Sequence, residues 1–352
     1  MGPEFWLSTR SVPGSRRAAQ LEAAGFDGLA FNESQNRAGD PYVALTAAAV
    51  TTSRIQLATG VTNPWTRHPA VTASAIASVQ AEAGGNRVSL GLGRGDSALA
   101  HLGLRPAPLP VFRWYLTCVQ AYLRGEEVPM EEAARGASHL IADGRLPLAD
   151  LPSASRLEWV ARLPPEQKVP VWVAASGPQV IRTAAELADR VTLAVGADPD
   201  RVAWAIRLAR SVRPDVPIGA FVNVDVHDDP GAALRRAGGR IASFARFSAM
   251  YGEPSGPLAP GQREVLSGLA KSYQMTRHGG RGSQSEALTP EFAERFAVLG
   301  SPARCRERLE ELAALGVDRF HIIGPDSEYQ GEFRKRFLTE VMRPLRADLR
   351  AG

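Results

Sequence analysis

Short apolar runs typical of β-strands alternate with Ala-, Leu- and Arg-rich helical segments along this chain of 352 residues. The helical segments carry end signals: Pro69 opens one of them, and Gly316 closes another that begins at Ser301. Eight strands, each followed by a helix, match the repeat of a (β/α)8 TIM barrel, and this α/β fold is predicted. A doubly wound sheet stays open as an alternative, because periodicity does not reveal strand order. The predicted strands are Phe5–Leu7, Gly28–Phe31, Ile55–Gly60, Val88–Gly91, Val169–Ala174, Val191–Val195, Ile218–Val226 and Arg319–Ile323.

Two intervals are too long to be simple strand-to-helix connections. One covers residues of about 125–168 and is rich in Pro, Glu, Arg and Leu, and the other covers about 251–290 and is rich in Gly, Ser and Pro. Connections of this length in a compact domain are usually lids or binding loops, or are disordered. Residues 1–352 are therefore predicted to form a single barrel domain with two insertions, which are the expected place of substrate specificity.

Composition argues against several classes of protein. The formal net charge is +4, but Arg and Lys are interspersed with Asp and Glu, which suits an anionic small molecule better than a nucleic acid. Cys118 and Cys305 lack metal-ligand spacing and the six His residues are dispersed, so no metal site is predicted. No apolar run approaches the roughly 18 residues of a membrane span, and no signal peptide pattern opens the chain. A soluble cytoplasmic protein is expected.

The segment Val169–Gln179 predicts a strand, a tight turn and the start of a helix. Its apolar run stops at Ser176, and an Ala-rich helical pattern follows. Gly177 lets the backbone come close to a ligand, and Pro178 suits the first helical position. Free N–H groups and the positive end of the helix dipole would then face an anion, so a phosphate-bearing cofactor is predicted here. The same pattern also fits an ordinary strand-to-helix turn.

Polar residues follow the carboxyl ends of several predicted strands, where the chemistry of a barrel gathers. Taken in order, these segments resemble the luciferase-like flavin and deazaflavin oxidoreductases, and within them the coenzyme F420-dependent branch typified by methylenetetrahydromethanopterin reductase. The resemblance spans nearly the whole chain, with several motifs in the expected order. It rests on Thr59–Pro64, Thr66–Pro69, Gly91–Ser97, Ala174–Pro178, Phe296–Pro302 and Gly316–Phe320.

The resemblance implies contacts with a phosphorylated ring cofactor. Thr59, Gly60 and Val61 would lie beneath the deazaflavin ring, and the peptide bond at Gly60-Val61 is often cis in this family. The cofactor phosphate would be held by the two turns that follow the fifth and sixth strands. The residues predicted to hold the phosphate are Ala175, Ser176, Gly177, Pro178, Gln179, Val195 and Gly196, and Asn32, Asn63 and Gly93 are predicted as further cofactor contacts.

A carboxyl group is predicted to supply the proton of the reaction. Asp96 stands where related enzymes carry an acidic residue that faces the substrate. Other members have a His after an Asp at the end of the second strand, whereas this chain has Asn32 and Glu33, which speaks against a His proton donor. Asp96 and Glu33 are therefore the catalytic candidates, since partial burial can tune a carboxyl to donate a proton near neutral pH. Either could instead be a solvated carboxylate, and Asp96 could cap the following helix.

Trp65, His68 and Arg94 are the predicted substrate contacts, although His68 could equally be a helix-entry residue that packs locally. The implied reaction is hydride transfer between C5 of F420 and an electrophilic carbon of a small organic substrate, in an imine, an activated alkene or a carbonyl. Either direction is compatible with the sequence. Two alternatives stay open: an FMN-dependent luciferase-like monooxygenase, and a barrel that binds a ligand without catalysis. The resemblance also implies a homodimer.

Overall fold

The computed structural model describes residues 2–11, 13–135, 152–250, 252–280 and 282–351. Eight parallel strands follow one another in the order β9-β11-β1-β2-β3-β4-β7-β8, and β8 also pairs with β9, which closes the barrel. The predicted TIM barrel is confirmed, and the doubly wound alternative is wrong because an open sheet has no closing pair. The barrel strands are β1 (Glu4–Arg10), β2 (Gly28–Asn32), β3 (Gln56–Thr59), β4 (Val88–Leu92), β7 (Val171–Ala175), β8 (Arg190–Leu193), β9 (Ile218–Val226) and β11 (Arg319–Ile323).

Each predicted strand corresponds to one of these barrel strands, and only the ends differ. The first strand continues to Arg10, whereas the third and sixth end before Gly60 and Val195. Strand ends depend on pairing with neighbouring strands, and apolar character alone does not show where that pairing stops. Gly60 and Val195 therefore lie in the turns that follow the strands, where site residues of a barrel are expected.

Helices connect the strands, and several of them begin with the same device. A proline occupies the first helical position, and the preceding side chain accepts hydrogen bonds from first-turn N–H groups that have no partner within the helix. These caps are Asp40 of α2, His68 of α3, Asp198 of α8, Asp229 of α9, Thr289 of α12 and Ser301 of α13. None of the described helices is long and apolar enough to span a membrane. The helices are α1 (Gly14–Ala24), α2 (Pro41–Thr51), α3 (Pro69–Ala83), α4 (Ser97–Ala100), α5 (Leu109–Leu123), α6 (Met130–Ala134), α7 (Pro178–Leu187), α8 (Pro199–Arg210), α9 (Pro230–Ala245), α10 (Pro260–Ser272), α11 (Ser283–Glu286), α12 (Pro290–Phe296), α13 (Pro302–Ala314), α14 (Gln330–Arg336) and α15 (Arg343–Ala351).

Shorter elements complete the chain and are concentrated in the connections. The remaining strands are β5 (Val128–Pro129), β6 (Ala154–Ser155) and β10 (Val298–Gly300). The short helical turns are η2 (Val160–Arg162), η3 (Pro165–Gln167), η4 (Arg246–Ser248), η5 (Met275–Arg277) and η6 (Ser327–Tyr329), and η7 (Phe337–Met342) is a π-helix.

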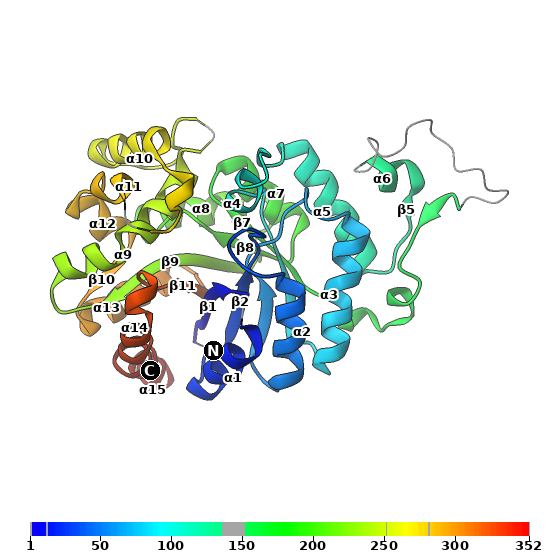
Figure 1. Cartoon of the computed structure of the whole chain (residues 1–352), viewed down its shortest axis with the longest axis horizontal. Coiled ribbons are helices and arrows are strands. Elements are labelled where there is room, and N and C mark those ends of the chain that lie inside the picture. The colour runs from blue at the N-terminus through cyan, green and yellow to red at the C-terminus, as the bar shows by residue number, and fades with distance from the viewer. Residues whose placement is uncertain (1, 12, 136–151, 251, 281, 352) are drawn as a thin grey trace. The chain divides into compact units, whose positions relative to one another are not determined.

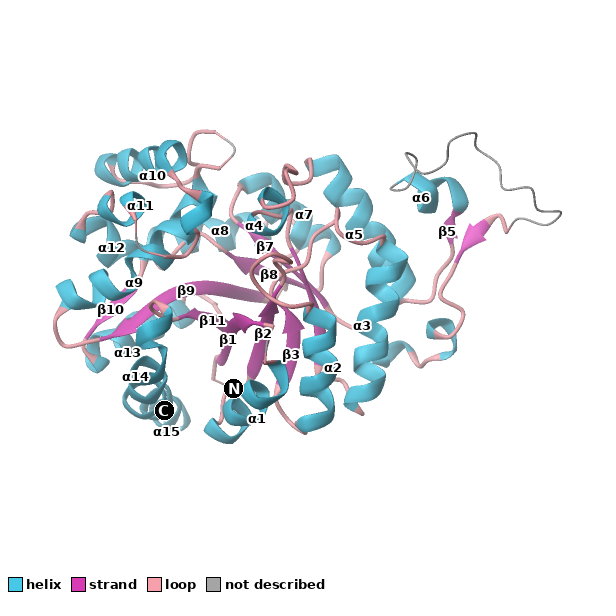
Figure 2. Cartoon of the chain, viewed as in Figure 1, coloured by secondary structure: helices cyan, strands magenta, loops and turns pink. Residues whose placement is uncertain are grey.

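The chain divides into two compact units, each with its own core. Unit 2 comprises Thr9–Glu22 and Ala30–Trp172, and in it α2 packs against α3 and β3 (Figure 2). Its core has no space beside Gly91, where a Cβ atom would lie 2.2 Å from the carbonyl oxygen of Thr59 and 2.3 Å from the ring of Trp172. Glycine is therefore required at this position of β4 for the two neighbouring strands to pack.

Unit 1 comprises Met1–Ser8, Ala23–Leu29 and Val173–Gly352. Within it the ring of Trp6 covers Gly28, where a Cβ atom would lie 2.1 Å from the indole. The helices α9, α10, α11 and α12 gather together in Figure 1 and enclose an apolar cluster of their own. The cluster includes Ala237, Ile241, Leu266, Phe292 and Phe296.

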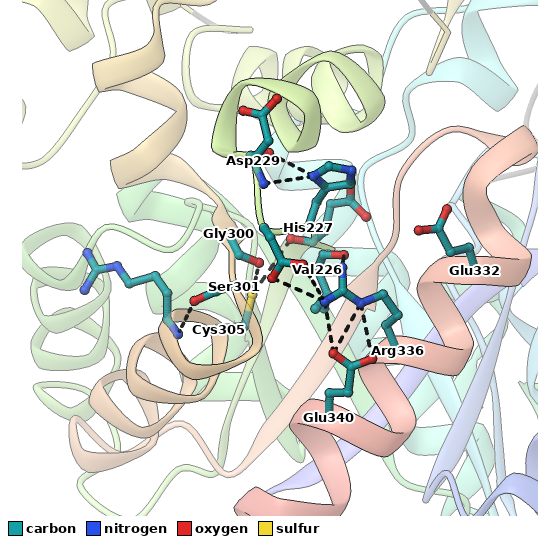
Figure 3. Close-up of polar contacts among 12 residues, drawn as sticks. Val226, His227, Asp229, Gly300, Ser301, Cys305, Glu332, Arg336 and Glu340 are labelled. Atoms are coloured by element: carbon teal, nitrogen blue, oxygen red, sulfur yellow. Dashed lines mark hydrogen bonds and ion pairs between the residues drawn. The ribbon is translucent and has the colours of Figure 1, made fainter.

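The strand β10 extends the sheet of unit 1 beyond the barrel by pairing in parallel with the end of β9. Arg336 of α14 holds this end of β9, since its Nη1 donates to the carbonyl of Val226 at 3.3 Å and its guanidinium pairs with Glu340 (Figure 3). The thiol of Cys305 is buried beside the same segment, 3.5 Å from the carbonyl oxygen of Gly300. The carboxyl end of β9 is thus fixed by side chains from two later helices.

The two predicted insertions contain regular structure. In the first, β5 and β6 form an antiparallel pair and α6 follows β5, while residues 136–151 lie outside the described residues. The second holds α10, η5 and α11. Its Gly, Ser and Pro content suggests a plain loop, but Leu266 and Leu269 of α10 are buried, so apolar packing has stabilised a helix there.

Candidate active site

The predicted phosphate-binding turn joins β7 to α7 in unit 1. The helix starts at Pro178 like the capped helices, but Gly177 stands at its N-cap and supplies no side-chain hydrogen bond. Gly177 has a φ of −106°, which other residues adopt, and a Cβ built on it would meet no atom within 4 Å. The N–H groups of Gln179 and Val180 therefore lack a side-chain cap at the positive end of the helix dipole, and the space that a side chain at Gly177 would occupy is open. This arrangement fits a phosphate group.

The turn after β8 runs beside the turn after β7. The backbone N–H of Ala194 donates to the carbonyl of Ala175 at 2.8 Å, which joins the two segments. Gly196 has a φ of +85°, and a Cβ there would lie 2.6 Å from the ring of Phe296. Both its conformation and its surroundings therefore require glycine, so the turn has a fixed shape next to the start of α7.

The hydroxyl of Ser176 already has a partner in the protein. Its Oγ donates to the carbonyl of Phe247 at 3.1 Å. In this rotamer the hydroxyl can accept a hydrogen bond but has no second proton to donate. A phosphate at this turn would therefore meet backbone N–H groups rather than the Ser176 proton, and the predicted contact of Ser176 with the phosphate stays a prediction.

The segment predicted to lie beneath a cofactor ring follows β3 in unit 2. The Gly60–Val61 peptide bond is cis, the geometry that the family resemblance implies. Gly60 is closely packed, since a Cβ there would lie 2.6 Å from the Cβ of Ala30. Thr59 is buried, and its Oγ1 donates to the carbonyl of Gly91 at 2.8 Å and accepts from the N–H of the same residue at 2.9 Å. Its side chain thus joins β3 to β4.

Glu33 is the centre of a hydrogen-bond network in unit 2. Its Oε1 accepts from Arg67 Nη1 at 2.7 Å and from Thr66 Oγ1 at 2.9 Å. A third bond comes from Gln35 Nε2 at 3.1 Å, and Arg67 also pairs with Asp40. The Glu33 side chain is 1% exposed, and its Oε2 has no hydrogen-bond partner in the part of the chain that the structure describes. A carboxylate held this firmly anchors the segment that leads into α3.

Asn63 shapes the same segment. Its Oδ1 accepts from the N–H groups of Trp65 at 3.0 Å and Thr66 at 3.2 Å, which turns the chain from β3 toward α3. Asn63 is buried, and its Nδ2 finds no acceptor among the described residues. Because Thr66 binds both Asn63 and Glu33, the structure brings these two predicted site residues together. A buried amide donor without a partner fits a ligand with acceptor atoms.

Asp96 and Arg94 follow β4. Asp96 stands at the N-cap of α4, but its side chain makes no capping hydrogen bond, so the capping alternative is wrong. The Nε of Arg94 donates to the carbonyl of Ala107 at 2.6 Å, and the N–H of Ala107 donates back to the Arg94 carbonyl at 2.8 Å. The backbone N–H of Gly93 donates to the carbonyl of Thr62 at 2.9 Å. Arg94 and Gly93 therefore hold the loop in place, and Asp96 is the acid candidate within it.

His68 caps α3, which agrees with the alternative that it is a helix-entry residue with local contacts. Its Nδ1 accepts from the N–H of Ala70 at 3.2 Å, and its Nε2 lies 2.6 Å from the carbonyl oxygen of Ala133. Because Nδ1 accepts, Nε2 carries the proton and donates it. Trp65 is 43% exposed and Asn32 is partly buried at the end of β2. Substrate contact by His68 and Trp65, and cofactor contact by Asn32, stay predictions.

Sequence patterns do not indicate Arg201, which the structure places in the first turn of α8. The residue is 1% exposed, and its Nε donates to the carbonyl of Val195 at 3.3 Å. The position of Arg201 in the sequence is nevertheless unusual, because a cation is unfavourable beside the positive end of a helix dipole. An Arg at the third position of the helix, after Pro199 and Asp200, is therefore explained by contacts outside the helix.

The luciferase-like monooxygenase family matches residues 14–319. The chain belongs to this family. A 5,10-methylenetetrahydromethanopterin reductase of Methanolobus tindarius is 27% identical over 339 residues, covering 93% of this chain and 95% of the reductase. The resemblance stated from the sequence motifs is confirmed, and with it the prediction of an oxidoreductase.

Solved structures share the luciferase-like barrel over nearly its full length. The coenzyme F420-dependent tetrahydromethanopterin reductase from Methanopyrus kandleri aligns with a TM-score of 0.69 and 21% identity, covering 98% of this chain and 100% of that one. The oxygenating constituent of 3,6-diketocamphane monooxygenase from Pseudomonas putida, in complex with FMN, aligns with a TM-score of 0.62 and 16% identity, covering 97% and 99%. At these identities the likeness shows the fold alone.

Proposed function

We propose that this luciferase-like oxidoreductase uses coenzyme F420 to transfer a hydride to or from an electrophilic carbon of a small organic substrate. The observation that carries the proposal is the start of α7, where no side chain caps the first N–H groups and a Cβ at Gly177 would meet no atom within 4 Å. The similar structure from Methanopyrus kandleri is named as F420-dependent, which supports a deazaflavin at this turn. When bound, reduced F420 supplies a hydride from its C5 to an imine, an activated alkene or a carbonyl.

The residues of unit 1 are proposed to bind the phosphate of the cofactor. The N–H groups of Gln179 and Val180 would donate to phosphate oxygens, and the dipole of α7 favours the negative charge. In unit 2, the Gly60–Val61 segment is proposed to support the ring, and the unused Nδ2 of Asn63 to donate to a ring acceptor. These side chains position the cofactor and are not proposed to react.

Asp96 is proposed to deliver the proton that accompanies hydride transfer. Reduction of a carbonyl, an imine or an activated alkene adds a hydride to carbon and a proton to the other atom of the double bond. Asp96 follows β4, at the barrel end where catalytic residues gather, and it does not cap α4. Glu33 is proposed to position the Asn63–Arg67 segment, because three donors already occupy its Oε1.

Equilibrium titration with oxidised F420 and with FMN tests the proposal. Tight binding of F420 with weak binding of FMN supports deazaflavin hydride chemistry, preference for FMN supports the monooxygenase alternative, and binding of neither supports a barrel without catalysis. Gly177→Val tests the turn itself. Its side chain fits a position with no neighbour within 4 Å and should fold normally, yet it would fill the proposed phosphate space and abolish cofactor binding. Gly85→Val, at an equally open position, is the matched control.

A homodimer through the outer face of α2 and α3 is also proposed. Val43 and Val50 of α2 are 71% and 61% exposed, and Val71 of α3 is 55% exposed. The sequence of α2 contains no charged residue, and that of α3 contains Glu82 alone. Exposed apolar residues gathered on adjacent helices without charges are typical of surfaces that contact another protein.

A further inference from the structure

Arg201 joins three segments around the turn that follows β8. Its Nε donates to the carbonyl of Val195, and its Nη2 donates to Ser248 Oγ at 3.3 Å. Its Nη1 donates to the carbonyls of Ser255 at 3.1 Å and Pro257 at 3.4 Å. One buried guanidinium thus holds the turn, the short helix η4 and the start of the second insertion.

Two of these contacts lead directly to the proposed phosphate site. Val195 precedes Gly196 in the turn that Ala194 joins to β7. Ser248 follows Phe247, whose carbonyl accepts the hydroxyl of Ser176. Arg201 therefore binds the turn after β8 directly at Val195, and it binds Ser248, the neighbour of the residue that holds Ser176 in the turn after β7.

Arg201 is also a buried cation that forms no direct ion pair among the described residues. No carboxylate lies within 4 Å of its guanidinium in the described ranges, and all four of its hydrogen-bond acceptors are uncharged oxygens. Burial lowers the pKa of Arg201 to about 10, and the nearby charge of Asp198 opposes this decrease. Because a pKa of about 10 is well above neutral pH, the guanidinium stays charged. A buried charge interacts with a nearby anion more strongly than a surface charge does, because water screens it less.

The second insertion is fastened to α8 at the same place. Trp204, one turn after Arg201, packs on Gly256, where a Cβ would lie 2.8 Å from the indole. Gly256 has a φ of +87°, so the chain bends there in a conformation that favours glycine. Arg201 therefore connects the insertion, through Ser255 and Pro257, to the turn at Val195.

We propose that Arg201 is a positioning residue of the phosphate site: it fixes the Val195 and Ser248 segments, and it is the buried cation whose charge the cofactor phosphate balances. The inference rests on the proposed function. Arg201, in the first turn of α8, then contributes to cofactor recognition as well as to the stability of the fold. It also makes the second insertion a support of the phosphate site.

The experiment measures how strongly the protein distinguishes a phosphorylated ring from an unphosphorylated one. Wild type, Arg201→Met and Arg201→Lys are titrated with 8-hydroxy-5-deazariboflavin 5′-phosphate and with the same compound lacking the phosphate. Arg201→Met should reduce the preference for the phosphorylated compound by at least about tenfold, and Arg201→Lys should keep most of it. Arg207→Met, an exposed arginine of the same helix, should leave the preference unchanged.

The ratio of the two affinities is the decisive quantity. If Arg201 only stabilised the fold, Arg201→Met would weaken the binding of both compounds equally. Equal losses, or an unchanged preference in Arg201→Met, would overturn the inference. If Arg201→Met does not fold, Ser248→Ala removes one Arg201 contact and should reduce the preference about two- to threefold, and no reduction would overturn it. A wild-type protein without any preference for the phosphorylated compound would instead overturn the proposed function. Added inorganic phosphate should raise the melting temperature of wild type more than that of Arg201→Met.

Discussion

The Nη1 of Arg67 lies 2.7 Å from the Oε1 of Glu33, and this oxygen also accepts a hydrogen bond from the hydroxyl of Thr66. The pair therefore anchors the segment between β3 and α3, and the buried carboxylate has a structural task. Glu33→Gln removes the charge that holds Arg67 and should lower the free energy of unfolding by about 2 kcal/mol. Denaturant titration followed by circular dichroism measures this loss.

Asp40→Asn is the matched control, since Asp40 pairs with the same Arg67 but its side chain is 41% exposed. An exposed ion pair contributes little, so this change should cost less than about 1 kcal/mol. Asp96→Asn should abolish most of the turnover, because Asn cannot deliver the proton. If Glu33→Gln keeps full stability and loses turnover, Glu33 acts in catalysis and the anchoring role is wrong.

Gly91→Ala should be among the most damaging single-atom changes in unit 2. The added methyl would lie 2.2 Å from the Thr59 carbonyl oxygen and 2.3 Å from the Trp172 ring, and the backbone of a neighbouring strand cannot move aside. A loss of at least about 3 kcal/mol in the free energy of unfolding is expected. Gly85→Ala, with no atom within 4 Å, should change stability by less than about 0.5 kcal/mol. Equal stability of the two variants would show that the strands separate more easily than the packing indicates.

Asp225 should make the stability of the fold depend on pH. The side chain is fully buried at the end of β9, and burial raises its pKa to about 6, although Arg236 at 3.0 Å acts in the opposite direction. An unfolded chain releases this proton near pH 4. Between about pH 4 and pH 6 the folded protein keeps a proton that the unfolded chain has lost, so this group's contribution to stability is present at low pH and is lost as the pH rises.

Asp225→Asn does not titrate and isolates this effect. The free energy of unfolding of the variant, relative to wild type, should increase by about 2 kcal/mol between pH 4 and pH 6. Asp228→Asn, at a carboxylate that is 73% exposed, should show no such trend. A difference between Asp225→Asn and wild type that stays constant with pH would contradict the prediction.

Both cysteines should be unreactive in the folded protein. Burial raises the pKa of Cys118 to about 11 and that of Cys305 to about 12, and only a thiolate reacts quickly. Iodoacetamide near pH 8 should therefore label neither residue before unfolding and both residues after it. Mass spectrometry counts the labels, and rapid modification of the native protein would show that one of these helices opens.

The outer face of α2 offers a test of the proposed dimer. Val43→Glu with Val50→Glu places two charges on an exposed apolar face, which should reduce the mass in solution from that of two chains to that of one. Analytical ultracentrifugation measures the mass. Val43→Thr with Val50→Thr keeps the shape without the charge and should weaken association less. A wild-type protein with the mass of one chain would overturn the dimer.

Much of the fold could be predicted from local signals. Pro69 and Pro302 mark helix starts that the structure shows at the same residues, because an N-terminal proline and its cap act over one turn. Apolar runs located all eight barrel strands. The apolar runs do not themselves show which strands pair, so barrel closure, seen in the β8–β9 pair, was predicted from the number of strands and from the family resemblance.

The candidate site shows the same limit. The sequence located the turns at Gly60 and Gly177, because glycine and proline report backbone geometry locally. It could not show that Glu33 has Arg67 as a partner, or that Arg201 contacts a turn and an insertion, because those contacts depend on segments that only folding brings together. Side-chain partners, rather than backbone turns, separate an anchoring carboxylate from a catalytic one.

The nine-stranded sheet has few places where a foreign strand could attach. Closure of the barrel leaves the three-residue strand β10 as an end of the sheet in the order that the structure describes. Exposed strand edges are the template on which misfolded chains aggregate, and short edges resist this. Barrel closure therefore protects this protein against aggregation, and lengthening β10 is the change most apt to remove that protection.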